Sequence, residues 1–278
     1  MSGADANSDA ASRLTAALSQ RFGDAPVGAP GNDMLARMAQ HRSHRAFQDK
    51  PVDAALIRLI SAVALSAPSK SDLQQRDIVI VQDKALRQKL DALMQDMEWL
   101  PKAPALLVVC GNNRRQRQVH EWRGRPFAND HLDPFFNAAT DAAIVLGWLV
   151  LAAEAAGLGC CPLSVIRNRA QAASELLGLP DHVFPYAGLA LGWPNGEGNL
   201  TPRLPLAATL HTDRFDDRNI RNLVEGYDKQ RRYRTQRHEA EYGRADPYGW
   251  SEDKARQYSK PERADFGAFV RRKGFKLD

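Results

Sequence analysis

Apolar residues recur at helical spacing in several stretches of the chain. In the segment 53–66, four apolar positions share one face, and Asp53 can cap the first turn. The four positions are Leu56, Leu59, Ile60 and Val63. The same spacing predicts further helices along the chain. Their ranges are 12–22, 34–40, 83–93, 134–156, 170–177, 219–233 and 260–273.

Short apolar runs lie between these helices. The run 77–81 reads Asp-Ile-Val-Ile-Val and is continuously apolar after its first residue, as in a strand that is buried on both faces. Three other runs have this character, at 105–110, 160–166 and 186–191. Helices and single strands that alternate over residues 41–195 predict three layers, with helices on both faces of a central sheet.

The helix predicted at 134–156 is the most apolar part of the chain. Its uninterrupted apolar run, 142–153, is about 12 residues long, whereas about 18 are needed to cross a bilayer. Polar residues, among them Asn137 and Asp141, interrupt the apolar pattern ahead of this run. We therefore expect a buried core helix and no association with a membrane.

Charge and cysteine content narrow the classes of function. A net charge of +5 over 278 residues permits an anionic ligand without requiring nucleic acid. The N-terminal residues include neither a basic nor an apolar stretch, so we expect no secretory signal. Three cysteines are too few for a disulfide framework and predict a reducing compartment, the cytoplasm. The adjacent Cys160 and Cys161 would point to opposite faces of a strand, which favours small buried residues over a redox pair.

Candidate chemistry begins at residues 41–45, which read His-Arg-Ser-His-Arg. Guanidinium groups bind phosphate through paired hydrogen bonds, and a serine hydroxyl adds a donor. A solvated basic strip ahead of a helix is the alternative for this motif alone. The sequences Pro-Ser-Lys at 68–70 and Pro-Arg-Leu-Pro at 202–205 favour a phosphate site. The spacing of the histidines predicts no metal site.

In their order and spacing these segments resemble the FMN-dependent nitroreductase and flavin reductase family, over about residues 34–278. Gly-Leu-Gly at 157–159, Leu-Gly-Trp-Pro at 191–194 and Trp-Ser at 250–251 continue the resemblance, and the last is similar to the oxygen-insensitive NADPH nitroreductase subgroup. The resemblance implies an α/β (α+β) fold, a nitroreductase-like three-layer α-β-α sandwich with a central mixed sheet. Its implied parts are an N-terminal extension and short helix (1–33), an FMN-binding core (34–205) and a C-terminal arm (206–278). The arm would wrap around the partner in a homodimer and could contact NADPH.

The same resemblance assigns residues to the cofactors. Arg237 and Arg244 lie where the subgroup binds the 2′-phosphate of NADPH, with a charged helical face as the alternative. The FMN-binding positions are His41, Arg42, Ser43 and Arg45 for the ribityl and phosphate groups, Pro68, Ser69, Lys70 and Gln74 for the isoalloxazine and its side chain, Leu163, Ser164 and Val165 for the strand beneath the flavin, and Arg203 for the phosphate.

The chain departs from the family pattern at several of these positions. Thr201 stands where the subgroup usually has lysine, which removes one positive charge. Ser164 and Val165 replace glycines that are common in the subgroup. Asp72 would either face the flavin ring or lie in an exposed turn. The arginine-rich stretch 112–130 predicts a lid, either solvated or holding an anionic substrate.

The function that the resemblance implies is an NAD(P)H oxidoreductase. FMN would pass hydride through its N5 atom to small planar acceptors: nitroaromatics, quinones or flavin. The flavin carries the redox chemistry, so no catalytic side chain is expected. NADPH or NADH would leave before the acceptor enters, in a ping-pong mechanism. The alternatives are a specialised reductase of one catabolic or biosynthetic intermediate and a non-enzymatic protein that binds flavin or nucleic acid.

Overall fold

The computed structural model describes residues 3–23, 31–95 and 97–278. Contacts divide the chain into two compact units, each of which combines segments that are distant in sequence. Unit 1 consists of Met1–Arg42 and Asn199–Glu262, and unit 2 consists of Ser43–Gly198 and Arg263–Asp278. Both units therefore cross the boundaries that we expected at residues 33 and 205.

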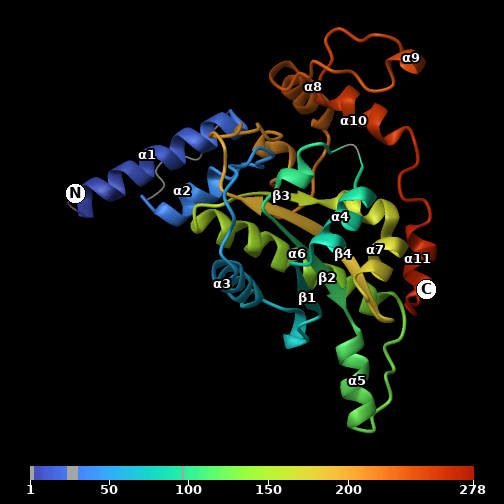
Figure 1. Cartoon of the computed structure of the whole chain (residues 1–278). Coiled ribbons are helices and arrows are strands. Elements are labelled where there is room, and N and C mark those ends of the chain that lie inside the picture. The colour runs from blue at the N-terminus through green and yellow to red at the C-terminus, as the bar shows by residue number, and fades with distance from the viewer. Residues whose placement is uncertain (1–2, 24–30, 96) are drawn as a thin grey trace. The chain divides into compact units, whose positions relative to one another are not determined.

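Unit 2 is built on a four-stranded sheet in the order β1-β2-β4-β3 (Figure 1). All pairings of these strands are antiparallel. The expected mixed sheet is therefore wrong for the four strands, and the parallel pairing recorded among the described residues is an isolated bridge between Ser43 and Cys160. Continuous apolar runs indicate burial on both faces, but they carry no information about strand direction. The strands are β1 (Arg76–Val81), β2 (Ala105–Asn112), β3 (Gly159–Leu163) and β4 (Val183–Gly192).

Helices cover both faces of this sheet. One face packs against α3 (Ala54–Leu65) and α6 (Leu132–Ala155), and the other packs against α4 (Lys84–Leu93) and α7 (Ala170–Leu176). Side chains of β2 alternate between the two cores, because successive residues of a strand point to opposite faces. Leu107 and Val109 lie in the first core, and Leu106 and Val108 lie in the second. The predicted three-layer architecture is confirmed.

The side chain of Asp53 caps α3 as predicted, by accepting a hydrogen bond from the backbone N–H of Ala55. The predicted core face of the helix is partly wrong. Ile60 is buried, but Leu59 and Val63 are 61% and 46% exposed. α3 is apolar on nearly all sides, so its periodicity cannot decide which of two apolar faces meets the core.

α6 is the central helix of unit 2 and lies within two residues of its predicted bounds. Among the described residues it is the one helix whose length and hydropathy alone would allow it to cross a membrane. It packs along the sheet instead, with Val145, Leu149 and Ala153 fully buried in the core that it shares with α3. The prediction of a core helix is confirmed.

The end of the chain completes unit 2. Phe269 and Val270 of α11 (Phe266–Arg272) are buried in a cluster with Phe184 of β4, and Phe275 meets Phe184 edge-on with ring centroids 5.6 Å apart. Residues 263–278 therefore belong to the same compact unit as the sheet, although we expected them in the arm. The helix α5 (Arg114–Trp122) extends away from the sheet beyond the end of β2 (Figure 1). The short 3₁₀ helices of the unit are η1 (Lys70–Asp72), η2 (Leu100–Lys102) and η3 (Ser164–Arg169).

Unit 1 joins the N-terminal helices to most of the segment after residue 198. The first helix begins well before the predicted range of 12–22, and Ala10, Leu14 and Ala17 form its buried side. The helix at 250–258 was not predicted. The helices of this unit are α1 (Gly3–Phe22), α2 (Asp33–Ala39), η4 (Leu206–Ala208), α8 (Ile220–Gln230), α9 (Glu239–Tyr242) and α10 (Trp250–Tyr258).

Candidate functional site

The arginine–serine segment, residues 41–45, meets the edge of the sheet at β3. Ser43 forms a parallel bridge with Cys160, and the backbone N–H of His44 donates to the Cys160 carbonyl at 2.9 Å. The ring of His44 lies against Gly159, where a Cβ atom would be 2.7 Å from the ring carbon Cγ. A glycine at this position therefore lets the segment lie close against the strand.

The two arginines of this segment fall in different units. Arg42, half-buried like His41, is the last residue of the first part of unit 1, and Ser43 begins unit 2. Arg45 is exposed and lies beside Cys161. Burial raises the pKa of the Cys161 thiol, and the positive charge of Arg45 partly offsets this effect. The charge of Arg45 is thus placed at the edge of the sheet.

The second set of predicted residues forms the 68–75 turn, which leads into β1. Ser71, Asp72 and Gln74 have positive φ angles of 49°, 56° and 51°. Each such conformation costs a non-glycine residue roughly 1–2 kcal/mol, so the surrounding structure must hold it in place. Asp72 is exposed and accepts a hydrogen bond from Nε2 of Gln74 at 3.1 Å. It therefore lies in an exposed turn, one of the two alternatives given for this residue.

Asp141 of α6 holds the turn. Its carboxylate has no exposed surface and accepts three hydrogen bonds, at 2.8–3.0 Å, from the Ser69 hydroxyl and from the backbone N–H groups of Lys70 and Gln75. Ser69 Oγ in turn accepts from the backbone N–H of Gln74 at 2.7 Å. A buried carboxylate that receives three donors fixes the backbone of the turn, on which Pro68, Ser69, Lys70 and Gln74, the residues expected to bind the cofactor, lie.

In the sequence, Asp141 reads only as an interruption of an apolar helix. The available signal was its position, because a carboxylate just ahead of a long apolar run must find partners when it is buried. Its partners could not be predicted, since they lie about 70 residues earlier in the chain.

The 68–75 turn is also braced from the arginine-rich stretch. Nη1 of Arg115 donates to the carbonyl of Gln74 at 2.8 Å, and Nη2 forms an ion pair with Asp77 at 2.5 Å. Later in the stretch, Arg117 pairs with Asp130 at 2.5 Å, while Trp122 is 70% exposed. The first turn of α5 thus supports the candidate site, and its far end presents an aromatic ring to solvent.

The predicted strand 160–166 is shorter than expected. β3 ends at Leu163, whose side chain is buried in the core with α4 and α7, and Ser164 and Val165 begin the 3₁₀ helix η3. The hydroxyl-bearing Ser164 is exposed, and Val165 is half-buried. At Leu163 only the backbone is available to a ligand, because its side chain points into the core.

Arg203 lies in unit 1, where its backbone N–H donates to the carbonyl of Arg21 at 2.7 Å. Its side chain is exposed, and Nη1 donates to the carbonyl of Thr201 at 3.2 Å. A hollow of about 470 Å³ opens beside it. The other lining residues include Phe22, Thr201, Tyr227, Arg231, Tyr233 and Trp250. A cationic wall next to aromatic rings suits an anionic group carried by a planar or sugar-containing molecule.

The two arginines proposed for NADPH differ in their surroundings. Arg237 forms an ion pair with the buried Asp253 at 3.2 Å. Arg244 lines a hollow of about 330 Å³ together with Arg232 and Arg234. The structure thus gathers three exposed guanidinium groups around one concave surface, and Arg237 is not among its lining residues.

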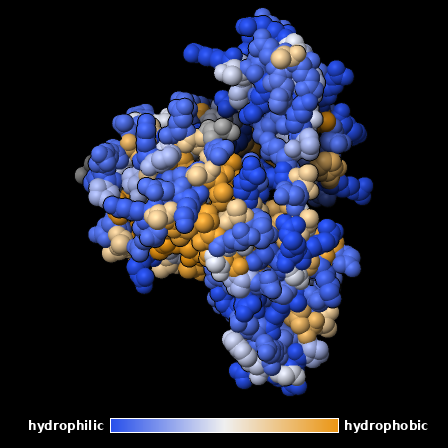
Figure 2. Space-filling model, turned by 45° about the vertical axis from the view of Figure 1, so that its right-hand side comes forward, coloured by the Kyte–Doolittle hydropathy of each residue, from blue (hydrophilic) through white to orange (hydrophobic). Residues whose placement is uncertain are grey.

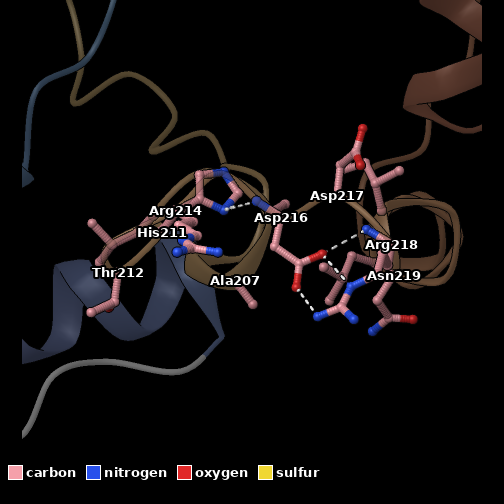
Figure 3. Close-up of a pocket in the computed structure, with 12 residues that line it drawn as sticks. Ala207, His211, Thr212, Arg214, Asp216, Asp217, Arg218 and Asn219 are labelled. Atoms are coloured by element: carbon pink, nitrogen blue, oxygen red, sulfur yellow. Dashed lines mark hydrogen bonds and ion pairs between the residues drawn. The ribbon is translucent and has the colours of Figure 1, made fainter.

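Another hollow of unit 1, of about 630 Å³, is lined by residues between Ala207 and Leu223 (Figure 3). Within it, His211 Nδ1 accepts from the backbone N–H of Asp216, and Asp216 pairs with Arg218 at 2.6 Å. The pairing with Arg218 lowers the pKa of Asp216 to about 2. None of the residues assigned to FMN or NADPH lines this hollow.

All three cysteines are free and buried. Cys160 lies in the core with α6 and Cys161 in the core with α4, as expected for neighbours on a strand. Burial raises the pKa of Cys110 to about 12, so its thiol stays protonated at neutral pH. The interpretation of Cys160 and Cys161 as small buried residues is confirmed.

Comparison with known proteins agrees with this geometry. A model of the nitroreductase family matches residues 38–193, and a model of the nitroreductase family C-terminal domain matches residues 201–278. FMN reductase (NAD(P)H) of Bacillus subtilis is 30% identical over 253 residues, which are 89% of this chain and 99% of that protein. Oxygen-insensitive NADPH nitroreductase of Salmonella typhimurium is 35% identical over 191 residues, 68% of this chain and 77% of that protein.

Solved structures give the same relationship. NfrA2 of B. megaterium superimposes with a TM-score of 0.81 at 31% identity and covers 89% of this chain and 99% of its own. An NADPH:FMN oxidoreductase of Vibrio harveyi, complexed with NAD+, has a TM-score of 0.75 at 26% identity, with 87% and 98% coverage. The three-layer fold, the two family matches and these relatives lead to one conclusion: the chain belongs to the nitroreductase family.

Proposed function

We propose that this protein is an FMN-dependent NAD(P)H oxidoreductase that reduces nitroaromatic, quinone or flavin acceptors. Relatives that cover most of the chain are named as FMN reductases and nitroreductases. The observation that carries the proposal is the 68–75 turn, which a fully buried carboxylate holds in a costly conformation. Strain that is maintained by dedicated buried contacts is typical of a ligand-binding site.

The residues present fit FMN. In unit 1, Arg42 and Arg203 offer guanidinium donors of the kind that a phosphate dianion requires. In unit 2, Ser43 offers a hydroxyl donor and Arg45 a guanidinium donor. The 68–75 turn presents the exposed Lys70 and Gln74 on a fixed backbone, which suits the polar edge of a flavin ring. When bound, FMN would supply the hydride chemistry, and the chain would bind it, orient it and exclude water.

In a single chain the arginine–serine segment and the 68–75 turn lie at opposite corners of the sheet. Ser43 bridges to β3 level with Leu191 of β4, and the turn enters β1 level with Phe184. The segment lies about 24 Å along the strands and, four inter-strand steps away, about 19 Å across them from the turn, or about 31 Å diagonally. An FMN molecule is shorter than this, so the segment and the turn of one chain would serve different cofactors.

A homodimer resolves this separation, because the partner can bring its own 68–75 turn to the segment. Apolar side chains reach the surface in a contiguous area (Figure 2). In unit 2, exposed apolar residues occur on α3 and α6, which pack against each other. They are Leu59, Val63, Leu65, Leu132, Phe136 and Trp148. Large exposed apolar surfaces of this kind mark protein interfaces, and we assign this one to the second copy of the chain.

For the hydride donor, the hollow lined by Arg232, Arg234 and Arg244 is the proposed site of the 2′-phosphate of NADPH. Arg237 would act indirectly, because its guanidinium is paired with Asp253. NADPH or NADH would leave before a small planar acceptor enters, in ping-pong kinetics. The proposed location is the cytoplasm, which suits three free thiols and a nicotinamide donor.

The absorbance spectrum of the purified protein tests the function. We expect a yellow protein whose flavin absorption is bleached by NADPH without oxygen and restored by an added nitroaromatic or quinone. A colourless protein after anaerobic purification with added FMN would contradict the proposal. Turnover of one compound only, in a panel of acceptors, would favour a specialised reductase.

The variant Arg203→Ala tests the phosphate site. Because its side chain is exposed, we expect little change in folding stability but about a tenfold loss of FMN affinity, the effect of one charge-assisted contact. Fluorescence titration of flavin-free protein measures this affinity. Arg214→Ala, an exposed arginine of the same unit, is the matched control and should bind FMN as the unaltered protein does.

A further inference from the structure

Arg21, near the end of α1, lies at the centre of a polar network in unit 1. Only 6% of this residue is exposed. Its guanidinium donates to three backbone carbonyls: from Nε to Ala39 at 2.5 Å, from Nη1 to Thr201 at 2.9 Å, and from Nη2 to His41. Its own carbonyl accepts from the N–H of Arg203 at 2.7 Å.

These contacts join two segments that are distant in sequence. One ends in His41 and Arg42, and the other contains Thr201 and Arg203, about 160 residues later. Arg21 reaches both from one rigid, planar fork, which fixes the distance between them more firmly than a single flexible contact would. Both segments carry residues that the proposed function assigns to the flavin phosphate.

The helix that carries Arg21 has a second, separate attachment. Arg13 forms ion pairs with Asp9 of α1, at 2.8 Å, and with Asp33 of α2, at 2.9 Å. Buried Leu14 and Ala17 add an apolar contact surface. The family match begins only at residue 38, after all of α1. α1 is therefore held against α2 by contacts that lie apart from Arg21 and from the residues assigned to the cofactor.

We propose that Arg21 is a positioning residue for the cofactor phosphate, supplied by the N-terminal helix. It holds the His41–Arg42 and Thr201–Arg203 segments at the spacing that the phosphate requires, and it adds a positive charge at the carbonyl of Thr201. This inference rests on the proposed function, because it needs FMN as the ligand. It concerns the phosphate, because these hydrogen bonds of Arg21 go to the segment that ends in His41 and Arg42 and to the segment that contains Thr201 and Arg203.

Comparison of FMN with riboflavin, which lacks the phosphate, tests the inference. Flavin-free Arg21→Ala is titrated with each compound, and fluorescence quenching gives the two dissociation constants. We expect the FMN constant to rise at least tenfold and the riboflavin constant to change less than twofold. Arg13→Ala, which loosens the same helix at its other attachment, should leave both constants within twofold of the unaltered protein.

Equal weakening of FMN and riboflavin would overturn the inference and make Arg21 a purely structural residue. An unchanged FMN constant in a folded variant would overturn it as well. If Arg21→Ala does not fold by circular dichroism, Arg21→Lys takes its place. It keeps the charge but loses the planar fork, so a selective loss of FMN affinity is expected and an equal loss would contradict the inference. Unaltered protein that binds neither compound would refute the proposed function itself.

Discussion

Asp141 determines the conformation of the most strained backbone near the candidate site. Its carboxylate is fully buried in α6, and each of its hydrogen bonds goes to the 68–75 turn. A carboxylate can accept from several donors at once, whereas an amide of the same shape offers one accepting oxygen and adds two N–H donors. An aspartate at position 141 can therefore accept all three hydrogen bonds, whereas an asparagine of the same size cannot replace it as an acceptor.

The substitution Asp141→Asn should therefore release the turn. We expect the free energy of unfolding to fall by about 2 kcal/mol, the cost of leaving buried donors unsatisfied, and the melting temperature to fall by about 5 °C. FMN affinity should fall about tenfold at the same time. Thermal unfolding and flavin titration measure the two effects.

Asp133→Asn is the matched control on the same helix. Asp133 is exposed and accepts a hydrogen bond from Nδ2 of Asn137, four residues later. This change should move the melting temperature by less than about 2 °C. Equal effects of the two substitutions would show that Asp141 has no special part in holding the turn.

At the level of single residues, the sequence indicated which side chains could bind a phosphate. It did not indicate which residues hold the backbone of these candidates in place. Arg42, Ser43 and Arg203 could be nominated because guanidinium and hydroxyl groups suit a phosphate. Asp141 and Arg21 could not be nominated, because their partners are backbone groups at distant positions. Such partners become visible only when the chain is folded.

Among the elements, His182, just ahead of β4, adds two hydrogen bonds to the contact between β4 and the C-terminal segment. Its Nε2 donates to the carbonyl of Gly274 at 2.9 Å, and its backbone N–H donates to the carbonyl of Lys273 at 2.7 Å. Burial, with the nearby positive charge of Arg117, lowers the pKa of His182 below its usual 6.5. The folded protein therefore holds this imidazole in its neutral form more firmly than the unfolded chain does.

The sign of the pH effect follows from the proton balance. As pH falls through about 6.5, the unfolded chain binds a proton at His182 before the folded protein does, so stability decreases. The stabilisation is fully present above this pH and is lost progressively below it. Urea unfolding at pH 7.5 and pH 5.5 should show a smaller loss of stability in His182→Gln than in the unaltered protein. The same loss in both proteins would contradict this prediction.

Helical periodicity and continuous apolar runs predicted most helices and strands of unit 2. Periodicity did not settle the orientation of α3, whose second apolar face carries Leu59 and Val63. It also did not predict α10, where polar and charged residues together dominate and no apolar stripe appears. The apolar runs likewise could not predict whether neighbouring strands are parallel or antiparallel, because that depends on where each connection returns the chain to the sheet.

For the whole molecule, the exposed face of α3 should control assembly. Leu59 is 61% exposed in the single chain, so Leu59→Asp should disturb the proposed dimer more than it disturbs the fold of one chain. We expect a monomer by light scattering after size-exclusion chromatography, together with loss of bound FMN, because each proposed site needs two chains.

Leu210→Asp provides the control for this experiment. Leu210 is 67% exposed and lies in unit 1, outside the α3–α6 face. This protein should remain dimeric and retain its flavin. A dimeric Leu59→Asp protein with full FMN content would rule out the α3–α6 face as the interface.

The arginine–serine segment and the 68–75 turn lie at opposite corners of the sheet, and this placement has a genetic consequence for the proposed dimer. A defect in the 68–75 turn of one protomer damages the cofactor of its neighbour, and a defect in the arginine–serine segment damages a protomer's own. When two differently damaged chains pair, both lesions therefore fall in the same site and the other site stays whole. Two alleles that are each inactive alone would complement each other in a mixed cell.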